Sequence, residues 1–158
     1  MRQETKNKIR RAVKILFVIY LLALVYFLFF AEGYGRKDFF EREYQYNLVL
    51  FREIRRFWKY RRSVGFMIAF LNIGGNVIGF MPFGFLLPVM RPKLRKFSLV
   101  TFLGFSFSLG VELIQLLGKV GCFDVDDLLL NTIGAVIGYW IFWICNRIRR
   151  LRYGEKKV

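Results

Sequence analysis

Four long apolar runs divide the chain. They cover residues 15–31, 64–90, 97–118 and 128–145, and charged side chains are almost absent from them. Each run is long enough to cross about 30 Å of hydrocarbon as a helix. The pattern predicts an all-α fold, a polytopic membrane bundle of four transmembrane helices that forms one domain over residues 1–158.

Two of these runs have unusual features. A basic stretch precedes the first run, but Phe29, Phe30 and Ala31 lack the small residues of a signal-peptide cleavage site. We therefore expect the first run to be a retained helix. The second run is longer than a straight span requires and contains Pro82 and Pro88, so we expect a kinked or broken helix there.

The polar segment between the first two runs contains a second kind of pattern. Over residues 47–62, Leu48, Phe51 and Ile54 recur near helical spacing, and basic residues occupy the other positions. This pattern predicts an amphipathic helix that lies on the membrane headgroups outside the cell. A solvated basic loop is the alternative.

The charges lie in the flanks of the apolar runs. The chain has 26 Lys and Arg against 11 Asp and Glu, a formal net charge of +15. Cations at the ends of apolar segments are typical of membrane anchoring, so we expect membrane lipids and no nucleic acid as partners. The N-terminus, residues 91–96 and the C-terminal tail are short and basic, which predicts that both termini are cytoplasmic. The nine basic residues in 36–62 count against this topology, because it places them outside.

Polar side chains interrupt the last three runs at helical spacing. The three stripes are Asn72, Asn76 and Gly79, then Ser108, Glu112, Gln115 and Lys119, and finally Asp127, Asn131, Gly134 and Gly138. Each stripe lies on one side of its helix. Because polar groups at membrane depth are costly unless they face protein or water, we predict that the stripes line an outward-opening polar cavity. Hydrogen bonding between helices is the alternative for each amide.

The available side chains limit the chemistry. The chain has no His, which excludes Ser-His and Cys-His nucleophiles and the usual zinc sites. Glu112 is either protonated in a dry cavity or paired with Lys119 or an external Arg. The nearby acidic residues Asp124, Asp126 and Asp127 could hold a hard cation or cap the fourth helix. Next to them, the thiol of Cys122 should have a raised pKa and be a poor nucleophile.

Three segments of the sequence resemble a known family. They are NIGGNVIGFMPFGFLLP, SLGVELIQ and FDVDDLLLNTIGAVIGY, and together they are similar to the VanZ-like bacterial membrane proteins, named for a teicoplanin-resistance factor. The resemblance covers residues 47–139. It marks Asn76, Pro82, Gly84, Glu112, Gln115, Asp124, Asp126, Asp127, Asn131 and Gly134. Many members have an Arg before the acidic motif, where this chain has Gly121 and Cys122.

Two functions are consistent with these patterns. The first is a binding protein of the bacterial cytoplasmic membrane, whose cavity holds a lipid-linked envelope precursor or a lipid-tailed glycopeptide; the resemblance implies a link to teicoplanin resistance. It needs no cofactor. The second is an enzyme in which Glu112 with Asp126 or Asp127 acts as a base or holds Mg²⁺ for chemistry on a lipid phosphate. A structural bundle or a small transporter is a third alternative.

Overall fold

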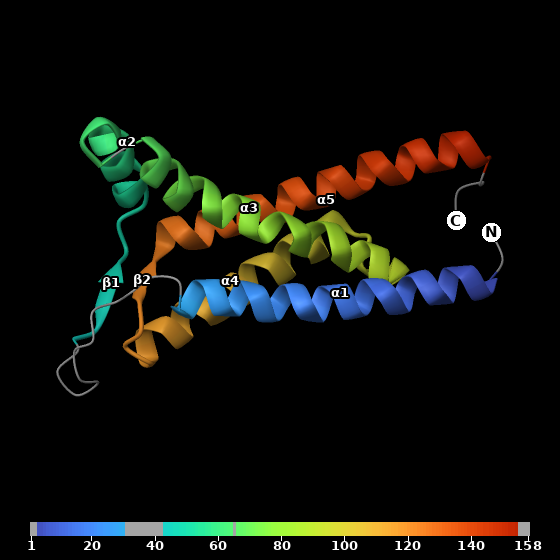
Figure 1. Ribbon diagram of the computed structural model, residues 1–158, viewed down its shortest axis with the longest axis horizontal. Helices are drawn as coiled ribbons and strands as arrows, with labels where there is room; N and C mark the ends of the chain where they lie inside the picture. The colour runs from blue at the N-terminus through green and yellow to red at the C-terminus, as the bar shows by residue number, and fades with distance from the viewer. Residues whose placement is uncertain (1–2, 31–42, 65, 155–158) are drawn as a thin grey trace.

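The chain folds into a bundle of helices with one very small sheet (Figure 1). The computed structural model describes residues 3–30, 43–64 and 66–154. Its elements in chain order are α1 (Gln3–Phe30), β1 (Gln45–Asn47), α2 (Arg52–Val64), α3 (Phe66–Met90), η2 (Pro92–Leu94), α4 (Phe97–Leu117), β2 (Cys122–Asp124) and α5 (Val125–Tyr153). The predicted all-α fold is confirmed, and α1, α3, α4 and α5 are each long and apolar enough to cross a membrane.

The bundle has two distinct ends (Figure 1). We call the end with α2, β1 and β2 the strand end. The opposite end, where α1 begins and α5 finishes, is the terminal end. At the terminal end, α1 and α5 project beyond α3 and α4 and diverge from each other.

Two helices are longer than the apolar runs predict. The first begins at Gln3 instead of residue 15, and the last covers Val125–Tyr153 instead of 128–145. Lys and Arg favour helices, so both helices continue into charged flanks where hydropathy gives no signal. The predicted ends of α3 and α4 at the terminal end are confirmed at Met90 and Phe97. Residue 31, the predicted end of the first span, lies outside the described residues.

The predicted amphipathic segment is a helix, but its start is displaced. The prediction of 47–62 is wrong for its first residues, because α2 begins at Arg52. Asn47 is instead the last residue of β1, and Phe51 has a left-handed φ of 64° that interrupts a helix. The alternative of a loop is wrong.

Of the two alternatives predicted for the second span, a kinked or a broken helix, the broken helix is wrong. The α3 helix runs without interruption from Phe66 to Met90 and includes Pro82 and Pro88. Each proline removes one backbone donor, yet membrane helices tolerate this where neighbouring helices support the backbone. The neighbour is α5, which packs closely against this part of α3.

Glycines bring the backbones of α3 and α5 into contact. A Cβ on Gly84 would lie 1.8 Å from Ala135 O, and one on Gly138 would lie 1.9 Å from Met81 O. At Gly134 the corresponding distance to Val77 O is 2.2 Å. No larger residue fits at this crossing without moving the two backbones apart.

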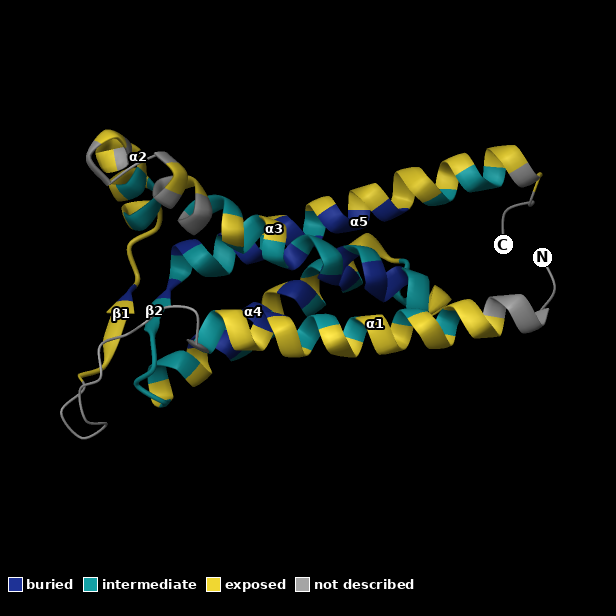
Figure 2. Ribbon diagram, viewed as in Figure 1, coloured by how far each residue is buried: buried dark blue, intermediate teal, exposed yellow. Residues whose placement is uncertain are grey.

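Buried residues concentrate where α3, α4 and α5 meet, whereas α1 is largely exposed (Figure 2). Aromatic rings fill the space beside the glycine crossing. Phe83 stacks on Phe107 with a centroid distance of 5.3 Å, and Phe80 contacts both rings. The contact of α1 with this core runs through Phe17, Tyr20 and Leu21, and the Tyr20 hydroxyl donates to Gly79 O at 2.7 Å.

A parallel pair of short strands closes the strand end. Gln45 pairs with Cys122 and Asn47 pairs with Asp124. The sequence did not predict this pair, because three-residue strands have no recognisable alternation and their partners are far apart in the chain. The pairing places the segment before α2 directly beside the start of α5.

Candidate functional site

Most of the predicted site residues meet at the strand end. We call this set the polar cluster; its members are Asn47, Asn76, Ser108, Glu112, Asp124, Asp126, Asp127 and Asn131. All but Asn76 and Asp127 are buried. They come from β1, α3, α4, β2 and α5. The polar stripes of three helices therefore converge near the acidic residues, as their spacing predicted.

Asp126 has no exposed surface, and its carboxylate caps α2. It accepts backbone hydrogen bonds from Phe51 N, from Glu53 N at 2.8 Å and from Ile54 N at 3.3 Å. These donors lie at the start of α2, where a helix leaves N–H groups without partners and favours a negative charge. One carboxylate of α5 therefore holds the N-terminus of α2.

Asp124 connects three further elements. Its carboxylate accepts from Asn47 Nδ2 at 3.1 Å and from Asp126 N at 2.8 Å, and the second bond makes it the N-cap of α5. Its backbone N–H donates to Glu112 Oε2 at 2.9 Å. Burial raises the pKa of Asp124 above its ordinary value, against the opposing effect of its two hydrogen bonds. Asp124 thus links β1, α4 and α5.

The remaining polar contacts join neighbouring helices. Asn76 Nδ2 of α3 donates to Asp127 Oδ1 at 2.5 Å. Asn131 Nδ2 of α5 donates to Ser108 Oγ of α4 at 2.9 Å. Asn131 Oδ1 is the one buried side-chain polar atom without a hydrogen-bond partner among the described residues. These bonds follow the interhelical alternative that the sequence left open for each amide.

The predicted site residue Gln115 does not join the polar cluster. Gln115 Nε2 donates to Leu28 O at 2.9 Å, so this amide binds α1 instead. Its position on the same stripe as Glu112 was too coarse a guide, because residues three apart on a helix differ in direction by about 60°. Asn72 precedes Asn76 by one turn on α3, but its side chain lies outside the described residues.

The acidic residues face different partners. Asp124 turns to Asn47 and the start of α5, Asp126 to α2, and Asp127 to Asn76. Within residues 3–30, 43–64 and 66–154, no three carboxylate or thiol groups converge in a way that could hold a metal ion. Helix capping therefore accounts for two of these residues and a bond between helices for the third.

Cys122 lies in β2 beside the polar cluster. Burial raises the pKa of its thiol above the ordinary value, and the negative charges of Asp124 and Glu112 raise it further. The predicted direction is confirmed. The thiol is therefore protonated near neutral pH and is a weak nucleophile.

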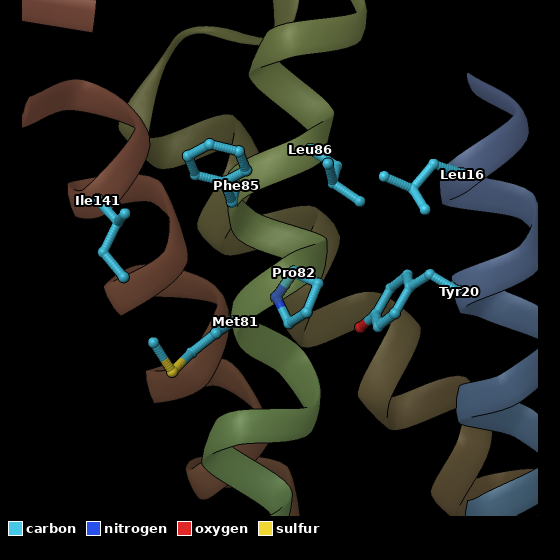
Figure 3. A pocket seen from close by; sticks show the side chains of 7 residues that line it. All are labelled: Leu16, Tyr20, Met81, Pro82, Phe85, Leu86 and Ile141. Carbon is cyan, nitrogen blue, oxygen red and sulfur yellow. The ribbon is translucent and has the colours of Figure 1, made fainter. Parts of the chain in front are cut away.

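Two features that bear on binding were not predicted from the sequence. Tyr20 and Leu28 fix α1 through hydrogen bonds to α3 and α4. An apolar pocket between α1, α3 and α5 is the second feature (Figure 3). Its lining is uncharged and irregularly spaced, and hydropathy cannot separate it from the lipid-facing surface. The outward polar cavity stays a prediction.

Comparisons with known proteins agree with the motifs. The model of the protein family described as VanZ/LLP1 matches residues 17–146. Protein VanZ of Enterococcus faecium is 36% identical over 75 residues, which are 46% of this chain and 44% of that protein. The chain therefore matches less than half the length of that relative. No solved structure matches.

Proposed function

This chain belongs to the VanZ/LLP1 family of membrane proteins, and from that premise we propose that its strand end binds an anionic lipid-linked envelope component or a lipid-tailed glycopeptide. In this proposal the strand end faces away from the cytosol of a bacterium, and both termini are cytoplasmic. Binding there contributes to resistance against glycopeptides such as teicoplanin.

The distribution of charge supports this topology. The start of α1, the turn at η2 and the end of α5 are all basic, and all lie at the terminal end. The loop before α5 at the strand end has three Asp against one Lys over residues 119–127. Short basic segments stay in the cytoplasm. The cations of α2 are an exception to this rule, because they lie at the strand end.

The main observation in support of the proposal is the fixed position of α2. Asp126 binds the N-terminus of α2 through three backbone hydrogen bonds. This cap holds an exposed row of cations at the strand end, which consists of Arg52, Arg55, Arg56, Lys59 and Arg62. Glu53 offsets the charge of Arg56 at 2.8 Å. The net positive charge that the row retains suits a phosphate or carboxylate headgroup.

Aromatic and aliphatic side chains beside these cations suit the apolar part of the same ligand. Trp58 of α2 is 62% exposed, and Leu48 and Tyr46 just before it are 64% exposed. Trp and Tyr favour the boundary between headgroups and hydrocarbon. An amphiphile with an anionic head could therefore contact α2 and these residues together.

The hydrogen bonds of the polar cluster favour binding over catalysis. Under the enzyme alternative, Glu112 with Asp126 or Asp127 would act as a base or hold Mg²⁺. Each of these carboxylates already accepts a hydrogen bond that connects two elements. Use of Asp126 as a base or metal ligand would compete with the cap of α2.

Paired neutral substitutions in α2 test the proposal. Arg55→Gln with Lys59→Gln removes charge at the strand end, and Arg91→Gln with Lys93→Gln removes the same charge at the terminal end as a control. In a host that lacks the gene, the α2 variant should lose protection against teicoplanin and the control should keep it. Equal protection by both variants would overturn the proposal, as would a wild-type protein that gives none.

Measurements on purified protein separate binding from turnover. The wild type should bind lipid-linked precursor or teicoplanin in a titration, and the α2 variant should bind more weakly. Incubation with the precursor, with and without EDTA, should leave it unchanged. Turnover that depends on Glu112 or Asp127 would favour the enzyme instead, and Glu112→Gln and Asp127→Asn are the variants that show this.

A further inference from the structure

An open apolar pocket of about 450 Å³ lies between α1, α3 and α5. In Figure 3, Leu16 and Tyr20 of α1 line one side, Pro82 and Leu86 of α3 lie between, and Ile141 of α5 lies on the other side. The lining is apolar, because the Tyr20 hydroxyl is hydrogen-bonded to Gly79 O. All three walls belong to helices that can cross a membrane. The pocket therefore faces acyl chains in the bilayer and not water.

Ile141 is the one α5 residue that lines the pocket, and α5 continues from it towards the terminal end. Ile141, Cys145, Ile148 and Arg152 follow one another at intervals of four, three and four residues, so they share one face of the helix. This face covers roughly 16 Å from Ile141 to Arg152 at 1.5 Å per residue. This face leads from apolar side chains to a cation, an order that suits the acyl chain and the headgroup of a lipid.

Both helices carry positive charge where they project beyond α3 (Figure 1). Four cationic residues lie on α1 at 7–14 and four on α5 at 146–154, and neither range contains Asp or Glu. They are Lys8, Arg10, Arg11, Lys14, Arg147, Arg149, Arg150 and Arg152. Because like charges repel, a bound anion between the two diverging helices would relieve this repulsion.

The geometry points to a binding site for an anionic glycerophospholipid of the bilayer. One acyl chain fills the pocket between α1, α3 and α5, and the phosphate lies between the projecting ends of α1 and α5. A concave apolar surface holds a chain by packing, while the cations select the headgroup. This site lies at the opposite end from the ligand proposed for α2, and it does not depend on that ligand.

The charge also decides against a second copy of the chain as the occupant. A helix of a second copy in this pocket would bring another set of cations to the same end in a parallel dimer. Repulsion between the two sets would then oppose association. A phospholipid has the opposite charge and is present in excess in every membrane, so it fits the site better.

A pair of Trp substitutions on one helix tests the pocket. Leu16 and Val18 of α1 are 53% and 55% exposed, but they point to opposite sides of the helix. Leu16→Trp fills the pocket, whereas Val18→Trp adds the same bulk elsewhere at nearly the same depth. Both sites are exposed, so both variants should fold, and their helix content by circular dichroism should match the wild type.

Native mass spectrometry supplies the measurement. The full-length protein is mixed with equal amounts of palmitoyl-oleoyl phosphatidylglycerol and phosphatidylcholine. The wild type should retain phosphatidylglycerol in preference, Leu16→Trp should retain at least fivefold less of it, and Val18→Trp should be unchanged. Arg152→Gln should lower the preference for the anionic lipid by about fivefold, the factor expected for one cation near a headgroup.

Three results would overturn the inference. The first is equal retention of the two lipids by the wild type. The second is a Leu16→Trp variant that loses no more phosphatidylglycerol than Val18→Trp. The third is a dimer whose abundance falls with Leu16→Trp, which would assign the pocket to a second copy. The α2 variants tested above should retain phosphatidylglycerol normally, so failure of one proposal is distinguishable from failure of the other.

Discussion

The strand end and the terminal end of this bundle are built in different ways. At the strand end, β1, α2, α3, α4 and α5 are joined by hydrogen bonds of the polar cluster, and buried carboxylates form the centre. Towards the terminal end, α3, α4 and α5 pack through apolar and small side chains, and α1 and α5 diverge (Figure 1). Hydrogen bonds hold the strand end together, whereas close packing of apolar and small side chains holds the terminal end together.

This difference shows which interactions fix the positions of helices and strands in a small membrane bundle. Lipid tails are as apolar as Leu, so apolar packing between helices has little hydrophobic driving force, and close contact has to come from small residues. Hydrogen bonds between buried polar groups can fix segments that do not cross the membrane, such as α2 and the strands. We therefore expect substitutions at the strand end to release α2, and substitutions at the glycine crossing to separate α3 from α5.

Asp126→Ala should have the largest effect. It leaves three backbone donors at the start of α2 without their carboxylate, and we expect the free energy of unfolding to fall by about 3 kcal/mol. An unfolding titration in mixed micelles measures this loss, and hydrogen exchange should show faster exchange at residues 51–54. Glu53→Ala, which breaks the partly exposed ion pair with Arg56, is the control and should cost less than about 1 kcal/mol. Equal losses for the two variants would contradict the role of Asp126 as a cap.

Gly138→Ala should have the next largest effect. Its Cβ would lie 1.9 Å from Met81 O, so the backbones of α3 and α5 must separate, at a cost of about 2 kcal/mol. A Cβ on Gly110 of α4 would meet no neighbouring atom within 4 Å, and Gly110→Ala should be neutral or slightly stabilising. The same titration compares the two. A Gly138→Ala variant with unchanged stability would show that the packing of α3 on α5 does not depend on this close backbone contact.

A double-mutant cycle of Ser108→Ala and Asn131→Ala should give a smaller energy. Their hydrogen bond at 2.9 Å joins α4 to α5, and polar bonds between membrane helices average about 0.6 kcal/mol in such cycles. Tyr20→Phe, which removes the bond to Gly79 O, should cost about the same. A coupling energy above about 2 kcal/mol would mean that single bonds, and not the cap on α2, dominate the strand end.

The rate of alkylation of Cys122 measures the reactivity of its thiol, and we expect this rate to be low at neutral pH. In a Cys145→Ala background, Cys122 is the one remaining cysteine. Because burial and nearby carboxylates raise the pKa of its thiol, the rate of reaction with a membrane-impermeant maleimide should stay low at neutral pH. The rate should rise with pH past the ordinary thiol pKa, because only the thiolate reacts.

Asp124→Asn sharpens this measurement. It removes one negative charge and keeps a side chain that can cap α5, so the midpoint of the pH–rate profile should move to lower pH. Burial is the larger cause and stays in place, so the shift should be small. A midpoint that does not move would contradict a contribution from Asp124. Labelling of intact cells by the impermeant reagent tests the outward orientation of the strand end.

Hydropathy predicted the four long helices because each apolar run must be shielded from water. It could not predict where α1 and α5 end, since Lys and Arg are themselves good helix formers. The pairing of β1 with β2 and the cap of α2 by Asp126 depend on contacts between residues about 75 positions apart. No local pattern encodes such contacts, so Asp126 was predicted as a cation ligand or a cap for its own helix.

The polar stripes predicted which residues come together better than they predicted what those residues do. Helical spacing correctly brought Asn76, Glu112 and Asn131 towards the acidic residues. It failed for Gln115, which faces Leu28, because the packing position of α1 cannot be read from spacing alone. Spacing could not predict the pocket beside Tyr20 for the same reason, since the pocket exists only where α1 and α5 flank α3.

The long separation between β1 and its partner has a consequence for the order of assembly in a living cell. Asn47 and the first turn of α2 leave the ribosome well before Asp124 and Asp126, which are 77 and 75 residues from the groups they bind. Until α5 is synthesised and inserted, the segment over residues 43–64 lacks its hydrogen bonds to Asp124 and Asp126. Closure of the strand end therefore has to wait for β2 and the start of α5, and a nascent chain stalled before β2 would expose α2 without its cap to proteases and chaperones.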